Sequence, residues 1–146
     1  MVSGEALAAV QAWTRLDQAV AGLNRELEQR FGVTGAQLAI LRIVAEWRPP
    51  VPLAGLRERL VMHPATLGQL LDRLAGRGFV ALAPDPADRR RRLVEITDRG
   101  RELLEQAPVA GPVRLRQTGA DPERLRRLAA ALTDAIELFG LEEYAR

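Results

Sequence analysis

The sequence predicts a mainly α-helical fold with one small β-hairpin. Three observations predict it. Apolar residues recur every three or four positions over most of the chain, the spacing of one helical face. Between residues 79 and 96 this spacing gives way to two short apolar runs around a Pro- and Asp-rich loop. Proline and glycine divide the remaining stretches into separate helices.

Two helices are expected first. Residues 5–31 form one amphipathic helix, because their apolar positions make a single stripe. The stripe consists of Leu7, Val10, Trp13, Leu16, Val20, Leu23, Leu27 and Phe31. Thr34 followed by Gln37 is the pattern of a capping box, which opens a second helix ending near Glu46. This helix is apolar on almost every side and is expected at the centre of the fold.

Two shorter helices follow a proline-rich break. The break consists of Pro49, Pro50 and Pro52. One helix is expected over residues 53–60, and the next runs from Pro64, a residue suited to a first helical turn, to Gly76. Its inward face consists of Leu67, Leu70, Leu71 and Leu74. Two helices separated by a few residues are typical of a helix-turn-helix.

A β-hairpin, or wing, is expected next, with strands over residues 79–82 and 93–96. Four consecutive arginines, Arg89 to Arg92, stand at its far edge. Strand alternation would send successive side chains to opposite sides of the hairpin, so we expect that not all four arginines reach the same part of a binding partner.

The remainder of the chain is expected to be helical in two parts. Thr97 caps a helix from Asp98 through Leu104, which Pro108, Gly111 and Pro112 end or bend. The following stretch has no clear pattern. Asp121 before Pro122 begins a last helix with an apolar stripe that runs to the end of the chain.

Composition excludes several classes of function. The 146 residues fit one domain, and 47% hydrophobic with 27% charged residues is typical of a soluble protein. No apolar run is long enough to span a membrane or resembles a leader, so we expect a cytoplasmic protein without membrane contact. The absence of cysteine and the single His63 argue against metal and redox sites, and no cofactor is expected. No phosphate loop or nucleophile motif indicates an enzyme.

The net charge of +2 is unevenly distributed. Residues 52–100 hold nine Arg against six Asp or Glu, a surplus of +3, while the rest of the chain carries −1. A local basic excess is expected where phosphates bind, although +3 is modest.

The order of elements is that of a winged helix-turn-helix, and the residues resemble the MarR family from Thr34 to about Gln106. The similar segments are residues 33–38, 64–67, 71–74, 77–80, 85–90, 93–97 and 100–104. The wing is the most specific match, whereas the terminal helices agree only by pattern. Two features depart from the family: Gly68-Gln69 in the recognition helix, and Pro108 to Pro112 inside what the family builds as one long helix.

The inward leucines determine which residues of the second short helix face outward. Ala65 and Gln69 point away from the core, with Thr66 and Arg73 on one flank and Gly68 on the other. These five are the candidate DNA-binding residues of a recognition helix. Arg73 is equally consistent with an ion pair inside the domain.

The resemblance implies roles for the wing as well. In relatives the residue matching Arg90 enters the minor groove, and the residue matching Asp88 holds that arginine in place. We therefore count Asp88, Arg89, Arg90 and Arg91 as candidate DNA-binding residues. Under the alternative reading, the arginines are merely a solvated surface.

The terminal helices, residues 1–31 and 110–146, are expected to form a dimerisation arm around a DNA-binding lobe over residues 34–104. Their apolar stripes would otherwise remain exposed, so we expect a homodimer on an inverted-repeat DNA operator. The resemblance implies a transcriptional regulator, expected to be a repressor, that a small aromatic ligand relieves. The alternative is a winged-helix module that binds proteins and does not read DNA sequence.

Overall fold

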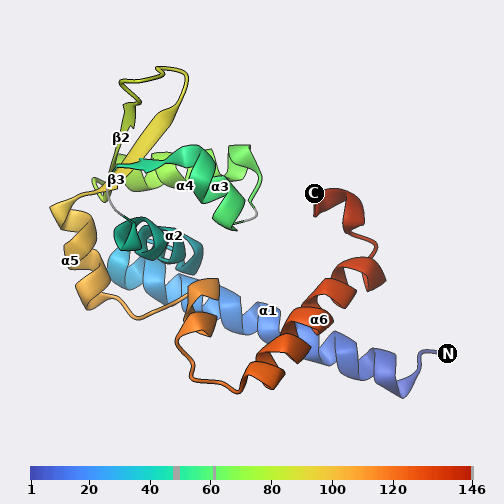
Figure 1. Cartoon of the computed structure of the whole chain (residues 1–146). Helices are drawn as coiled ribbons and strands as arrows, with labels where there is room; N and C mark the ends of the chain where they lie inside the picture. Colours follow the sequence, from blue (N-terminus) through green and yellow to red (C-terminus); the bar gives the residue numbers. More distant parts are fainter. Residues whose placement is uncertain (48–49, 61, 146) are drawn as a thin grey trace.

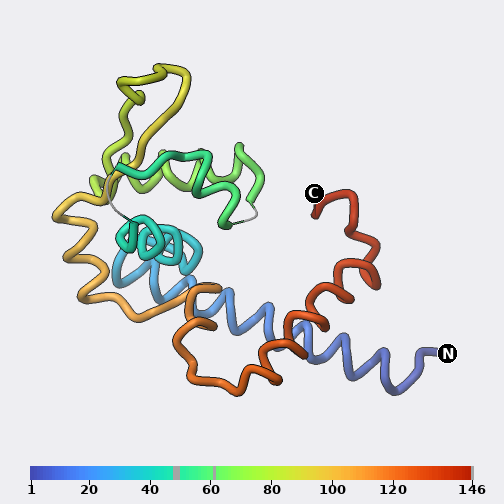
Figure 2. The backbone as a smooth tube through the Cα atoms, in the orientation of Figure 1, coloured from blue at the N-terminus to red at the C-terminus, as the bar shows by residue number. Residues whose placement is uncertain are grey.

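The computed structural model describes residues 1–47, 50–60 and 62–145. Its elements are the α-helices α1 (Gly4–Phe31), α2 (Gly35–Glu46), α3 (Leu53–Leu60), α4 (Pro64–Gly76), α5 (Asp98–Gln106) and α6 (Pro122–Leu138), the strands β1 (Val51–Pro52), β2 (Val80–Pro84) and β3 (Arg92–Ile96), and the 3-10 helices η1 (Pro112–Arg116) and η2 (Glu142–Tyr144). Helices α2 to α5 and the strands form one lobe, from which α1 and α6 extend as an arm (Figure 1). The backbone trace shows α6 crossing α1 away from the lobe (Figure 2). The predicted mainly α-helical fold is confirmed.

The caps predicted from sequence set the helix boundaries. Thr34 Oγ1 accepts a hydrogen bond from the Gln37 N–H, and Gln37 Oε1 accepts one from the Thr34 N–H, so the capping box is complete. Pro64 occupies the first turn of α4, where the lack of an N–H costs nothing. Thr97 caps α5 and Asp121 caps α6 through their side-chain oxygens.

The sheet has three strands in the order β1-β3-β2, one more than the sequence predicts. Strands β2 and β3 form the expected antiparallel wing, with Val80 opposite Ile96 and Pro84 opposite Arg92. Strand β1 pairs with the other edge of β3, and Val51 lies opposite Val94. Two residues carry too little alternation to mark a strand, and Pro52 reads as a break, so the sequence conceals β1.

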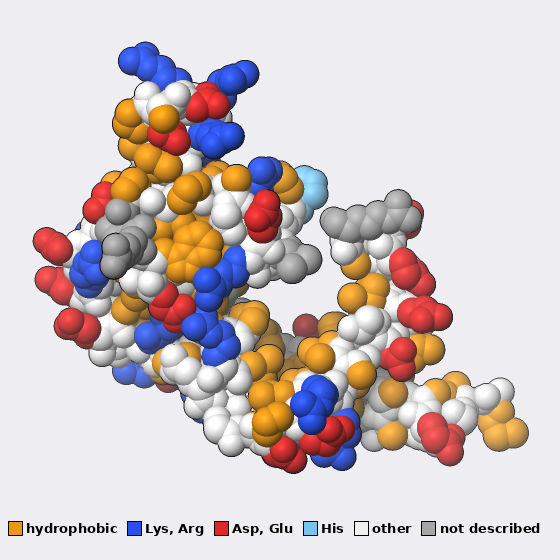
Figure 3. All heavy atoms as spheres, in the orientation of Figure 1, with side chains coloured by type: hydrophobic (Ala, Val, Ile, Leu, Met, Phe, Trp, Pro, Cys, Tyr) orange, Lys and Arg blue, Asp and Glu red, His pale blue; other side chains and the backbone are white. Residues whose placement is uncertain are grey.

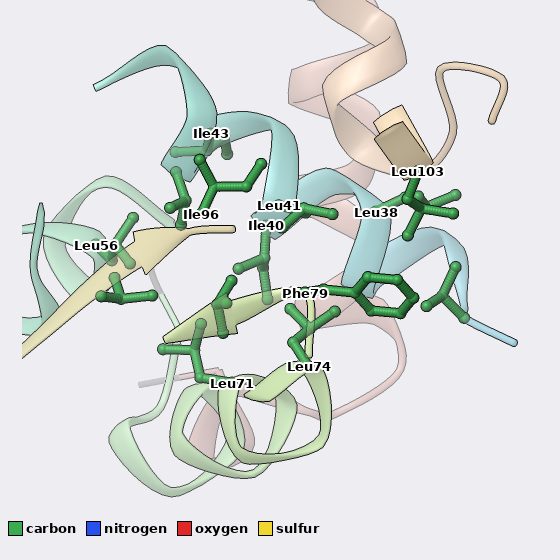
Figure 4. Packing of buried hydrophobic residues seen from close by; sticks show 14 of the residues in the cluster. Leu38, Ile40, Leu41, Ile43, Leu56, Leu71, Leu74, Phe79, Ile96 and Leu103 are labelled. Atoms are coloured by element: carbon green, nitrogen blue, oxygen red, sulfur yellow. The ribbon is translucent and has the colours of Figure 1, made fainter. Parts of the chain in front are cut away.

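The core lies between α2, α4 and the sheet (Figure 4). Helix α2 is buried on nearly all sides, as predicted, with Leu38 and Leu41 completely inaccessible to solvent. Leu67, Leu71 and Leu74 of α4 face it, while Leu70 is only partly buried. Because α4 packs against the core along this face, its opposite face is exposed to solvent; we call it the free face of α4.

The predicted break after α5 is confirmed, and the stretch without a clear pattern contains η1. Ala107 and Ala110, which lie between α5 and η1, are buried, and so is Val113 of η1. Gly111 has a φ of 73°, and a Cβ built on it would lie 2.5 Å from the carbonyl oxygen of Gly35. Only glycine allows the two backbones to approach this closely. The chain therefore leaves the lobe beside the point where α2 begins.

The arm exposes its apolar residues. Leu27 is the only buried residue of α1, and none of α6 is buried among the residues described. Trp13 contacts Phe139 with ring centroids 5.4 Å apart. The exposed stripe of α1 consists of Leu7, Val10, Trp13, Leu16, Val20 and Leu23, and that of α6 of Leu128, Leu132 and Ile136. Figure 3 shows apolar side chains along both helices. No helix within the described ranges is long and apolar enough to cross a membrane.

Candidate nucleic-acid interface

Helix α4 presents the candidate residues on its free face. Ala65, Thr66, Gln69 and Arg73 are exposed and Gly68 is partly exposed, as the inward leucines predict. No heavy atom lies within 4 Å of where a Cβ of Gly68 would be, so this part of the helix surface is bare. The free face thus combines an amide, a hydroxyl and small side chains, which suit contacts to base edges in a major groove.

The N-terminus of α4 is held by His63. Its Nδ1 accepts a hydrogen bond from the Ala65 N–H at 3.2 Å, so His63 is the N-cap of α4. The described residues contain no group of His, Asp or Glu suited to a metal ion. The role that the structure gives His63 is to cap the first turn of α4.

The tip of the wing is a tight turn organised by Asp88. Its Oδ1 accepts hydrogen bonds from the backbone N–H of Arg90 at 3.1 Å and from Arg90 Nε at 3.2 Å. Arg91 Nε lies 3.7 Å from Oδ2. The hydrogen bonds from Arg90, with a smaller contribution from the charge of Arg91, hold the pKa of Asp88 below its usual value. The carboxylate is therefore charged at neutral pH and orients Arg90.

The arginine side chain itself remains free for a partner. The side chain of Arg90 is 92% exposed while it contacts Asp88. Basic side chains project from the end of the wing in Figure 3. An oriented and exposed guanidinium is the group that a narrow, negative minor groove favours.

The expectation of strict alternation along Arg89 to Arg92 is wrong. Only Arg92 belongs to β3, whereas the other three lie in the turn, which hydrogen bonds from Asp88 N–H to Asp85 O and from Arg91 N–H to Asp88 O close. A turn does not alternate its side chains as a strand does. The sequence pattern could not locate the end of the strand within a run of identical residues.

Arg92 connects the wing to α4, a contact that sequence reasoning missed. Its Nη2 lies 3.3 Å from Oδ1 of Asp72, an exposed residue of α4. This ion pair joins the outer end of β3, next to the tip turn, to the exposed face of α4. No local pattern relates two residues twenty positions apart, so only the folded structure shows the pairing.

A cavity of about 510 Å³ lies where α1, α2 and α4 meet. Its lining includes Glu28, Gln37, Arg73 and Arg77. Arg77 Nη1 donates to the carbonyl oxygen of Gly32 at 2.8 Å and so ties the end of α4 to the end of α1. Among the residues that the structure describes, Arg73 makes no ion pair, which removes the internal partner considered for it.

Comparisons with known proteins agree with this geometry. The model of the MarR family matches residues 31–91, the segment that contains α2 to α4 and the wing tip. The transcriptional regulator HosA of Escherichia coli O111:H- is 37% identical over 108 residues, which are 73% of this chain and 72% of HosA. The chain belongs to the MarR family. This MarR-family protein is a DNA-binding transcriptional regulator and not an enzyme.

Solved structures share the fold. Sco3205, a MarR family transcriptional regulator from Streptomyces coelicolor crystallised in complex with DNA, has a TM-score of 0.68 and 20% identity, covering 97% of this chain and 91% of that one. PcaV from the same organism, crystallised with its natural ligand, has a TM-score of 0.66 and 20% identity, covering 94% and 97% of the two chains. At these identities the likeness supports the winged helix fold of the MarR-family chain and not the details of its site.

Proposed function

We propose that this MarR-family regulator binds an inverted-repeat operator as a homodimer, with α4 in the major groove and the wing tip in the minor groove. The observation that carries the proposal is the Asp72–Arg92 ion pair, which places the free face of α4 beside a wing that exposes Arg90. Gln69 and Thr66 contact base edges, and Ala65 and Gly68 allow close approach. Arg73 and the wing residues Asp88, Arg89 and Arg91 contribute or organise charge next to the phosphates.

The exposed arm supports the homodimer. Apolar stripes on α1 and α6 have no cover within the described chain, and exposed apolar surface of this extent marks an interface. A two-fold axis through the arm, formed by residues 1–31 and 110–146, pairs the two lobes, residues 34–104. Their recognition helices then reach successive major grooves about 34 Å apart. A dimer bound in this way obstructs a promoter that overlaps its operator, and repression follows.

The cavity at the junction of arm and lobe supports relief by a small ligand. An aromatic acid bound there meets Arg73 and Arg77, and it competes with the Gly32 carbonyl for Arg77. Breaking that hydrogen bond loosens the attachment of α4 to the arm. Such a ligand lowers DNA affinity only because it binds the loosened state more tightly.

Selection of duplexes from a random-sequence library tests the proposal. Selected duplexes should contain an inverted repeat, resist competition by unrelated DNA, and lose affinity when Arg90 is replaced by Ala. That variant should also show a shallower salt dependence, because one charged contact is gone. Failure to select any sequence, together with unchanged affinity of Arg90→Ala, would favour the protein-binding module instead. Phenolic and benzoic acids that raise the melting temperature of the wild type but not of Arg77→Ala would locate the ligand.

A further inference from the structure

A hollow between α3 and the wing gathers four arginines. This basic hollow has a volume of about 250 Å³, and its lining includes Leu53, Arg57, Arg90, Arg91 and Arg92. Arg57 comes from α3 and the other three arginines from the wing. The fold therefore brings a helix that sequence reasoning left without a role to the same place as the wing arginines.

Acidic side chains neutralise only part of this charge. Arg92 pairs with Asp72, while Arg90 and Arg91 share Asp88. Neither carboxylate lines the hollow. Arg57 makes no ion pair among the residues that the structure describes. Four guanidinium groups against two carboxylates leave an excess of +2 around one small concave surface. A recess lined by charge of one sign concentrates its field and attracts a counter-ion.

We propose that the basic hollow binds a backbone phosphate of the DNA duplex, with Arg57 as its principal contact outside the wing. The inference rests on the proposed function and extends the DNA interface to α3. Arginine suits the site because its planar fork binds phosphate oxygens bidentately. When the wing tip enters the minor groove of a duplex, the phosphates that flank this groove lie beside the wing arginines and α3. Contacts to phosphate fix position and orientation but carry no sequence information, so Arg57 is a positioning contact.

Two variants on one helix test the phosphate site. Arg57→Ala removes the contact, and Arg59→Ala is the matched control: Arg59 is also exposed on α3, but its guanidinium lies 5.2 Å from the ring centroid of Trp47 and does not line the hollow. Both variants remove one positive charge. Binding to a library-selected duplex and to an unrelated duplex of equal length is measured between 50 and 200 mM salt by fluorescence anisotropy. Arg57→Lys shows whether charge alone suffices.

Arg57→Ala should weaken binding to both duplexes by a similar factor. Its slope of log affinity against log salt should be shallower by about 0.9, the release expected for one phosphate. Arg59→Ala should keep the wild-type slope, and Arg57→Lys should keep the slope with a smaller loss of affinity.

Equal slopes for Arg57→Ala and Arg59→Ala would overturn the phosphate site, as would a loss confined to the selected duplex, which would indicate a base contact. Inorganic phosphate that raises the melting temperature of wild type but not of Arg57→Ala, without any change in DNA slope, would assign the hollow to a free anion. If wild type itself fails to distinguish the two duplexes, the proposed sequence-specific function fails. The slope on the unrelated duplex still decides the site in that case.

Discussion

Replacing Leu16 by Glu tests the paired arms. Leu16 lies in the middle of the exposed stripe of α1 and is 52% exposed. Full burial of a leucine side chain is worth about 1.5–3 kcal/mol, so roughly half of it, about 1 kcal/mol, is left to gain at an interface. A two-fold interface contains the position twice, which gives about 2 kcal/mol per dimer. Desolvation of the introduced carboxylates adds to this loss, so the dissociation constant of the dimer should rise at least ~30-fold.

Sedimentation over a concentration series measures that constant. Gln18→Glu is the matched control, because it adds the same charge on α1 and lies about 200° around the helix from Leu16. The control should dissociate as wild type does, and Leu16→Glu should be monomeric at concentrations where the control is dimeric. Equal dissociation constants for the two variants would refute the assignment of this stripe to the interface.

Three further outcomes are expected. Gly68→Ala should raise the free energy of unfolding by up to about 1 kcal/mol, because alanine is the better helix former and the added methyl meets no atom. The same variant should lower DNA affinity, because the methyl group keeps α4 from approaching the major groove closely. Unchanged DNA affinity would contradict the close approach. Gly100→Ala should lower the free energy of unfolding, measured by urea denaturation, by about 1–3 kcal/mol, because its Cβ would overlap the carbonyl oxygen of Phe79. An unchanged urea midpoint would show that the backbone shifts to make room for the methyl group. The pKa of Asp88 is lowered in the folded protein, so the turn that Asp88 holds is fully formed above the usual carboxyl pKa and is lost as the pH falls through the lowered pKa. The amide resonance of Arg90 should therefore stay constant from pH 7 to 5 and move only in more acidic solution. A shift near pH 5 would contradict the hydrogen bond from the Arg90 N–H to Asp88.

Sequence reasoning predicted the features that local chemistry determines. The Thr34–Gln37 capping box, the proline at the start of α4 and the leucines on its inner face each act over a few residues, so pattern and structure agree. The same leucines oriented the candidate face of α4 correctly, from Ala65 to Arg73.

Features that depend on distant pairing were not predictable. Strand β1 exists because β3 offers it an edge, and two residues leave no periodicity to detect. The run of four arginines conceals where turn becomes strand, which made the alternation argument fail. Arg57 lies on a helix for which the sequence indicates no role, and only the folded structure brings it beside the wing arginines. In each case the deciding partner lies elsewhere in the chain.

The backbone crossing of Gly35 and Gly111 has a mechanical consequence. Asn24 of α1 accepts a hydrogen bond from the Gly35 N–H at 2.8 Å, so both connections between arm and lobe pass through one small region. Two chain connections at one point form a pivot, and the exposed Arg116–Glu46 ion pair at the other end of α2 has to break when the arm turns about it. In the proposed dimer, a small rotation about this pivot is magnified at the recognition helices by the length of the lobe. In that dimer the pivot would set the half-site spacing that the protein tolerates, independently of the bases that α4 contacts.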